Sequence, residues 1–249
     1  MRFKIVLLIG LFPALFNAQI VNIESQRMQS DTIGWLGNFG TNFLFQKNAV
    51  EVLGVDVNAH IQYKTQKSLY LFLADFNFLK GSGQTLSDNI FYHFRYNYKI
   101  NKWLRWEAFT QLQNNNVTGI DLRFLAGTGP RFKIEGTKKL LLYAGTAAMY
   151  EYEKEATDPV IYLHNIRSSN YFSCTYKPVP NAEFIGTIFY QPLYNNLNDY
   201  RVLNEISINL SIVKHLSFVT SWTYLYDSKP VPNTPNLNYS ISNGIQYKF

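Results

Sequence analysis

Cysteine is almost absent from this chain, because Cys174 is the single one among 249 residues. A lone cysteine forms no disulfide within its own chain, so burial and hydrogen bonds must hold the fold together. The four histidines do not combine with it into a Cys/His cluster of the spacing that binds a metal. We therefore expect no metal site and no cofactor.

A strong charge of one sign is also missing. The formal net charge is +6, and no basic run with interleaved aromatic residues occurs. Nucleic-acid binding requires such a cluster, because grouped Lys and Arg hold the phosphates while aromatic rings stack on the bases. The charge pattern therefore argues against nucleic acid as a partner.

Long apolar runs are missing except at the beginning, which reads MRFKIVLLIGLFPALFNAQ. The apolar run 5–16 is too short for a membrane helix, which needs roughly 20 residues. Basic Arg2 and Lys4 before the run and small Ala18 after it form the layout of a secretory signal peptide. We expect residues 1–18 to be a signal peptide that is removed; an uncleaved anchor or a buried N-terminal helix is the alternative.

What the chain has instead is alternation with period two. In LGVDVNAHIQYK, residues 53–64, apolar side chains alternate with polar residues or glycine. The stretch IFYHFRYNYKI, residues 90–100, alternates in the same way. A strand with this pattern has one apolar face and one polar face.

The same pattern predicts twelve strands, at 35–45, 53–64, 70–78, 90–100, 103–114, 120–134, 140–152, 164–176, 182–192, 200–212, 216–226 and 237–249. The even number and the strand spacing suit an all-β, twelve-stranded antiparallel transmembrane β-barrel over residues 34–249. Such a sheet must close, because lipid offers no partner to an unpaired backbone group. A soluble secreted β-sandwich or a lipocalin-like barrel is the alternative. Residues 19–33 are then an N-terminal periplasmic segment.

The lengths of the connectors mostly alternate, as in membrane barrels with short periplasmic turns and longer external loops. The expected short connectors are 65–67, 101–102, 135–139, 177–181 and 213–215. The expected longer ones are 81–89, 114–119, 153–161, 193–199 and the proline-rich 227–236. The first hairpin, near 47–49, is an exception because it should be external yet is short.

The strand ends and the chain end carry aromatic residues. Tyrosine and tryptophan near predicted strand ends indicate girdles at the lipid interface: Trp35, Trp103, Trp106, Tyr150, Tyr152, Tyr224, Tyr226 and Tyr247. The final YSISNGIQYKF resembles the C-terminal signal by which bacterial outer-membrane barrels are recognised for assembly. We therefore expect Tyr247 and Phe249 to be an assembly signal for the barrel-assembly machinery, with outer-membrane lipid as the surrounding partner.

The polar faces carry charged residues of both signs. We expect the following to line the lumen: Asp56, Arg95, Arg105, Glu107, Asp121, Arg123, Arg201 and Glu205. One interpretation is a network of ion pairs that fills a narrow lumen. The other is a polar pore with modest ion selectivity. The similar numbers of acids and bases favour the network.

A lipid hydrolase would need a serine beside a histidine. HNIRSSNYFS offers His164, Ser168, Ser169 and Asn170. His164 and Ser168 share a strand face but are separated by about 13 Å at the rise of a strand, which is beyond hydrogen-bond reach. We therefore expect no catalytic residues and no enzyme activity.

The C-terminal part of the chain resembles the salt-induced, YdiY-like family of outer-membrane barrels, a domain family of unknown function. The segments that carry the resemblance are YEYEKE (150–155), YQP (190–192), NDYRVLNE (198–205), YDSKPVP (226–232) and GIQYKF (244–249). The resemblance implies an outer-membrane barrel and provides no site residues. The family usually has an acid before the last strand, where this chain reads NTPNLN.

These observations predict a non-enzymatic protein of the bacterial outer membrane. It is expected to be either a narrow passive channel for small solutes or ions or a structural barrel that responds to osmotic or salt stress. An outer-membrane lipid hydrolase of the phospholipase kind and a surface-recognition barrel are the alternatives. The oligomeric state is not determined by the sequence.

Overall fold

The computed structural model describes residues 33–47, 51–213 and 216–247. These residues form twelve antiparallel strands in one sheet, in which every strand pairs with its neighbours in the sequence. The strands are β1 (Gly34–Lys47), β2 (Glu51–Lys64), β3 (Ser68–Gly81), β4 (Gln84–Lys99), β5 (Leu104–Asn115), β6 (Ile120–Gly136), β7 (Leu140–Glu155), β8 (Tyr162–Val179), β9 (Ala182–Pro192), β10 (Tyr200–Val213), β11 (Leu216–Asp227) and β12 (Leu237–Tyr247). The predicted all-β, twelve-stranded antiparallel fold is confirmed.

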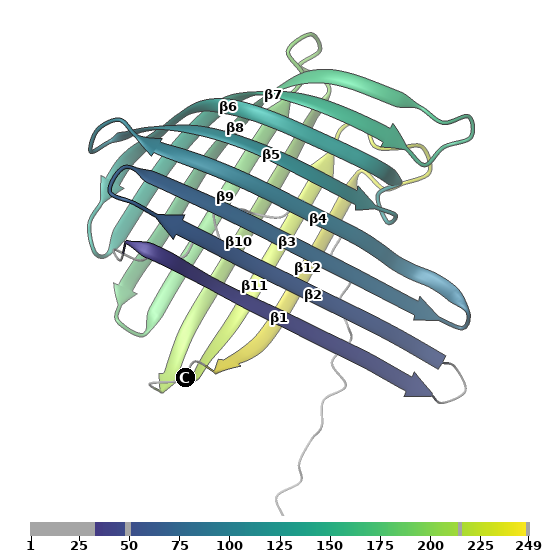
Figure 1. Cartoon of the computed structure of the whole chain (residues 1–249), viewed down its shortest axis with the longest axis horizontal. Coiled ribbons are helices and arrows are strands. Elements are labelled where there is room, and N and C mark those ends of the chain that lie inside the picture. Colours follow the sequence, from purple (N-terminus) through teal and green to yellow (C-terminus); the bar gives the residue numbers. More distant parts are fainter. Residues whose placement is uncertain (1–32, 48–50, 214–215, 248–249) are drawn as a thin grey trace, which may run out of the picture.

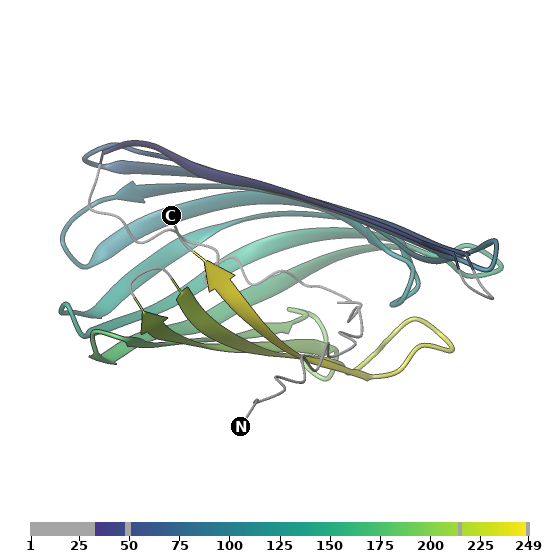
Figure 2. The same cartoon turned by 90° about the horizontal axis from the view of Figure 1, so that it is seen from below.

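The sheet curls around a central space, so that β1 to β5 face β8 to β12 across it (Figure 1, Figure 2). One end carries the connectors 65–67, 100–103, 137–139 and 180–181 and is called the turn end. The opposite end carries the connectors 82–83, 116–119, 156–161, 193–199 and 228–236 and is called the loop end. No helix in the described part of the chain is long and apolar enough to cross a membrane.

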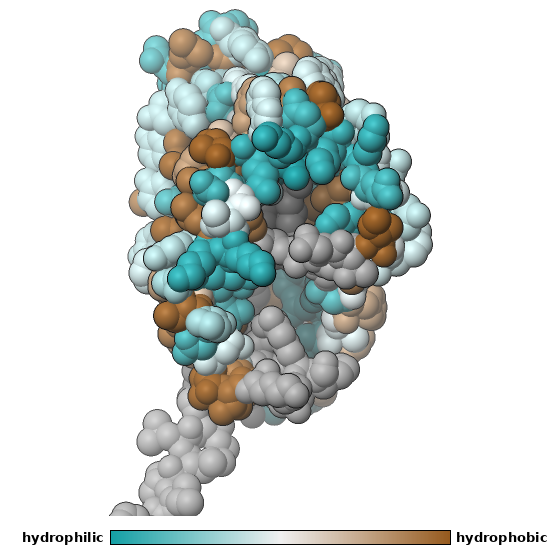
Figure 3. Space-filling model, turned by 90° about the vertical axis from the view of Figure 1, so that its left-hand side faces the viewer, coloured by the Kyte–Doolittle hydropathy of each residue, from teal (hydrophilic) through white to brown (hydrophobic). Residues whose placement is uncertain are grey.

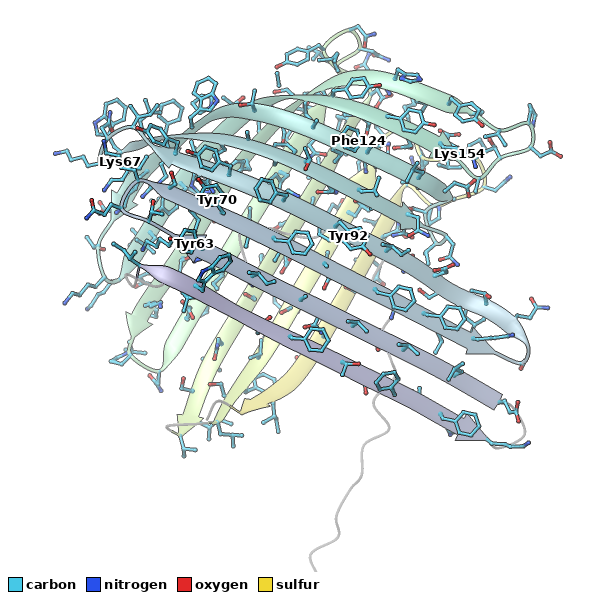
Figure 4. All side chains as sticks on the ribbon, viewed as in Figure 1. Tyr63, Lys67, Tyr70, Tyr92, Phe124 and Lys154 are labelled. Atoms are coloured by element: carbon cyan, nitrogen blue, oxygen red, sulfur yellow. The ribbon has the colours of Figure 1, made fainter. Side chains whose placement is uncertain are left out.

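The two faces of the sheet differ in the way that the alternation predicts. Outward side chains include the exposed rings of Phe72, Tyr92 and Phe94. Tyr92 is labelled in Figure 4. Inward side chains on the same strands include buried His93 and Arg95. The apolar face therefore points away from the curled interior, which is the reverse of a soluble protein and is typical of a barrel surrounded by lipid.

One predicted loop is wrong. The expected long connector 81–89 is a two-residue turn, because β3 continues to Gly81 and β4 starts at Gln84. Ser82 and Gly83 have φ angles of 53° and 80°, and positive φ at both central residues is the conformation of a tight hairpin turn. The polar sequence of this segment resembled a loop, although it forms the loop-end part of β4.

A bulge in β6 reverses one predicted side-chain direction. The register between β6 and β7 shifts between Ile120 and Leu122, so that Asp121 is the extra residue. Ile120 is buried on the inner face, whereas the Asp121 carboxylate lies on the outer surface, where Lys154 Nζ contacts it at 3.0 Å. The prediction that Asp121 lines the lumen is therefore wrong, because a bulge shifts the alternation by one residue.

The first and last strands, β1 and β12, differ from the rest of the sheet. The described residues of β1 and β12 do not pair with each other. The sheet is therefore not closed by backbone hydrogen bonds between its first and last strands, although closure was expected for a membrane barrel. Their inner faces carry small side chains such as Asn38, Asn42, Ser240 and Ser242.

Several predictions concern residues outside the described part of the chain. The signal peptide at 1–18 lies there, as does the segment 19–33 except for Ile33. The backbone of Tyr247 ends β12 opposite Leu216, while Phe249 lies outside the described residues. The proposed assembly signal therefore stays a prediction.

Candidate lumen of the barrel

A cluster of buried ion pairs occupies the interior nearer the loop end. Arg201 on β10 donates to Glu151 on β7, and its Nη2 lies 3.1 Å from Glu153 Oε2. Arg201 Nε also donates to Asp227 Oδ2 at 2.6 Å. Because β7 and β10 do not pair with each other, these contacts cross the interior and hold the curl of the sheet.

Glu151 is the centre of this cluster. Arg123 Nε donates to Glu151 Oε1 at 2.8 Å, and Arg167 Nε donates to Glu151 Oε2 at 2.5 Å. Arg167 Nη2 also contacts Asp199 Oδ1 at 2.9 Å. Glu151 is fully buried, so three guanidinium groups replace the water that would otherwise solvate its charge.

A second polar layer lies deeper in the barrel, towards the turn end. Glu107 Oε2 accepts a hydrogen bond from Tyr171 at 2.7 Å and lies 3.3 Å from Arg95 Nη1. Arg95 Nε lies 3.3 Å from His93 Nε2, and His93 Nδ1 lies 3.0 Å from Gln111 Oε1. This layer links the neighbouring strands β4 and β5 to β8, with which neither of them pairs.

Apolar side chains also face inward, which the sequence analysis missed. Leu71, Leu73 and Phe91 form a buried cluster on the inner face of β3 and β4. Tyr171, Phe189 and Leu203 form another on β8, β9 and β10. The signal was present in β3, where LYLFLA, residues 69–74, is apolar on both faces instead of alternating.

Two cavities lie on the inner face of the sheet: residues of β2 to β8 line the larger one, and residues of β2 to β5 line the smaller one. The larger, about 620 Å³, opens at the turn end and includes Gln62, Asn97 and Arg105 in its wall. The smaller, about 210 Å³, lies nearer the loop end and is lined by Asp56, Asp75 and other residues of β2 to β5. Seen from the turn end, hydrophilic side chains surround a hollow (Figure 3).

The connector between β11 and β12 folds inward over the cluster at the loop end. Val231 is buried and lies against Gly119, whose φ of +70° places it in the left-handed region. A Cβ at Gly119 would come within 2.9 Å of Val231 Cγ1, so the close contact requires glycine. Residues 228–236, predicted as a stiff external loop, therefore form a cap on the interior, and we call them the cap loop.

Seven of the eight predicted lumen residues lie on the inner face. Arg95, Glu107, Arg123 and Arg201 belong to the two buried layers, and Asp56 accepts a hydrogen bond from Asn77. Arg105 and Glu205 are half-buried on β5 and β10. Asp121 is the exception described above. The sequence analysis left out Arg167, which completes the Glu151 cluster, although it has the same parity as buried Ser169.

Of the two serines considered for hydrolysis, Ser169 lies on the opposite face from His164, and Ser168 shares the face of His164 but bonds to another residue. His164 Nδ1 lies 2.8 Å from the Tyr150 hydroxyl on the outer face. Ser169 is buried on the inner face, near Gln191. Ser168 Oγ donates to Asn170 Oδ1 instead of to a histidine. The structure therefore does not bring a serine and a histidine of this segment together.

Aromatic rings form rows on the outer face near both ends of the barrel. Near the turn end, Tyr63 and Tyr70 lie on neighbouring strands with ring centroids 6.2 Å apart (Figure 4). Near the loop end, the Tyr200 ring lies 5.7 Å from Tyr190 and 5.9 Å from Tyr226. Two such rows at opposite ends are typical of the girdles of a membrane barrel.

Comparison with known proteins identifies the family. Residues 51–249 match the family described as "Protein of unknown function, DUF481". This chain belongs to that family. The DUF481 family is the YdiY-like outer-membrane family to which the C-terminal segments showed a resemblance, and the match also includes β2 to β4. No curated protein matches the chain in sequence.

Solved structures with a similar fold are outer-membrane proteins. The NanC porin is 10% identical, with a TM-score of 0.50, and the match covers 79% of this DUF481 chain and 94% of the porin chain. A bacterial polysaccharide outer membrane secretin is 8% identical, with a TM-score of 0.47 and coverage of 87% and 86%. The translocator domain of autotransporter NalP from Neisseria meningitidis is 11% identical, with a TM-score of 0.44 and coverage of 86% and 87%. At such identities the likeness to the porin concerns the fold alone.

Proposed function

We propose that this protein is a narrow passive channel of the bacterial outer membrane for small solutes or ions. The family, the outward apolar face and the two aromatic rows support the outer-membrane location. The polar inner face supports an aqueous path, because the water-filled channels of porins have polar interiors.

The observation that carries the proposal is the pair of cavities on the inner face of the same strands. The cavity of about 620 Å³ extends from β2 to β8, and the cavity of about 210 Å³ lies along β2 to β5 at a different height, so β2 to β5 line both. On the opposite side, buried ion pairs fill the interior from β6 to β11. A solute path therefore follows β2 to β5 and avoids the Glu151 cluster.

The inner face of β3 is apolar between the two cavities. Leu71 and Leu73 lie between the levels of the cavities, and Phe91, which packs with them, lines the smaller one; all three are at most 5% exposed and form the proposed apolar constriction. An apolar constriction opposes ion flow because water leaves it readily. We therefore expect small conductance steps with long closed periods.

Planar-bilayer recording of the purified protein tests the proposal. Discrete, weakly selective steps are expected at each insertion. A recording with many verified insertions and no steps would contradict the channel. Insertion is verified separately by a difference in gel mobility between unboiled and boiled samples, which a folded membrane barrel shows and a soluble sandwich does not.

A structural barrel is the second candidate, and the cap loop favours it. Val231 closes the loop end against Gly119 while the Glu151 cluster lies beneath it. If this cap never opens, the barrel strengthens the envelope under osmotic or salt stress without conducting. Removal of residues 229–235 separates the two functions, because a capped channel gains conductance and a filled barrel does not.

A further inference from the structure

We propose that the turn-end cavity is a binding site for a small phosphate-bearing anion from solution. Seven lysines and two arginines line this cavity of about 620 Å³, and no carboxylate does. The volume is in the range of sites that hold small organic ligands. The proposal concerns binding and is independent of whether the barrel conducts.

The wall of the cavity holds its arginines in fixed positions. The Arg131 guanidinium carbon lies 4.0 Å from the centroid of the Tyr143 ring, and that of Arg105 lies 5.5 Å from the same centroid. Stacking on one ring orders two guanidinium groups before any ligand arrives. A guanidinium group offers paired donors that match the oxygens of a phosphate, so this pair forms a preorganised contact.

Basic residues outnumber acidic ones around the cavity. Lys177 is paired with Glu183 at 2.8 Å, whereas Lys99 and Lys133 point inward from β4 and β6 and form no ion pair with a described residue. Arg123, Arg167 and Arg201 all contact carboxylates at the loop end. The turn end therefore holds an excess of positive charge that an incoming polyanion would neutralise.

The position of the cavity favours a soluble solute over a lipid headgroup. Its wall includes Gln62 and Asn97, which are buried on the inner face of β2 and β4. Lipid contacts the outer face, on which the Tyr63 and Tyr70 rings lie (Figure 4). A phosphate group reaches the inner wall through the hollow at the turn end, without leaving water (Figure 3).

Tripolyphosphate is a suitable probe because it is small, highly charged and contains no base or sugar. Isothermal titration of the full barrel in a zwitterionic detergent should give saturable binding that weakens as salt is added. The double variant Lys99→Gln/Lys133→Gln should bind about tenfold more weakly, because it loses two of the positive charges that face the anion. The matched control is Lys154→Gln, which removes a lysine of the outer surface.

The outcomes separate the possible sources of phosphate. Gel mobility of unboiled samples first shows that each variant is folded. Absence of binding to the folded wild type, or equal binding by the double variant, overturns the proposal. A lipid headgroup would be the ligand if two results occur together. The wild type does not bind tripolyphosphate, and nanodiscs with phosphatidylglycerol raise its thermal stability but not that of the double variant. If the inserted protein shows no conductance steps but still binds tripolyphosphate, the channel proposal is contradicted and the binding-site proposal stands.

Discussion

The Tyr171 hydroxyl on β8 donates a 2.7 Å hydrogen bond to Glu107 Oε2 on β5. The tyrosine ring reaches this acid by crossing the inner face of β7, where its ladder partner is Gly145. Glu107 is itself paired with Gly129 on β6. Gly145 on the intervening β7 therefore makes room for a contact between strands that are not neighbours, because a Cβ there would overlap the Tyr171 ring.

This relationship makes Gly145 a sensitive position. A Cβ there would overlap the Tyr171 ring, which Glu107 and Arg131 hold in place. We expect Gly145→Ala to lower the free energy of unfolding by about 1–3 kcal/mol through overpacking. Gly186→Ala on β9 is the control, because its Cβ would meet nothing within 4 Å. Urea unfolding in lipid vesicles measures both, and equal stabilities would contradict the proposed packing.

Loss of Arg201 should be costly. Arg201→Leu leaves Glu151, Glu153 and Asp227 with fewer positive partners inside the barrel. We expect a loss of roughly 3–5 kcal/mol in unfolding free energy, which is typical of a buried charge left uncompensated. Lys154→Leu removes the exposed partner of Asp121 and should cost about 0–1 kcal/mol. Similar losses of unfolding free energy in the two variants would show that the Glu151 cluster does not stabilise the curved sheet.

The apolar constriction should control conductance. Leu73 and Leu203 are both 3% exposed, but only Leu73 lies along the proposed path on β2 to β5. We expect Leu73→Ala to raise the single-channel conductance and Leu203→Ala to leave it unchanged, although both lower stability by about 2–5 kcal/mol. Planar-bilayer steps measure the difference. An increase in Leu203→Ala alone would move the path to the other side of the barrel.

The bulge at Asp121 gives a prediction about side-chain direction. In a Cys174→Ala background, a polarity-sensitive dye on Asp121→Cys should report the outer surface, as should one on Trp106→Cys. A dye on Asn58→Cys should report water inside the barrel. If brominated lipids, which quench dyes in contact with lipid, quench positions 106 and 121 but spare 58, the faces are as described. Quenching at 58 would reverse them.

The sequence by itself determined the number of strands and the direction of most side chains. Period-two alternation places residues such as Arg95 and Tyr92 on opposite faces, because successive side chains of any strand point to opposite sides. This local rule needs no knowledge of the partner strand. It failed in segment 81–89, where a two-residue turn is concealed in polar residues, and at Asp121, where one extra residue shifts the alternation.

Only the tertiary structure decided which inward residues meet. Glu151 contacts Arg123 on the neighbouring β6 but also Arg201 on β10, fifty residues away along the chain. Alternation gives no information about the curvature of the sheet, and the curvature brings β7 and β10 within reach of each other. The same curvature gathers the lysines of several strand ends around one cavity at the turn end and places Asp199 and Asp227 beside the arginines near the loop end.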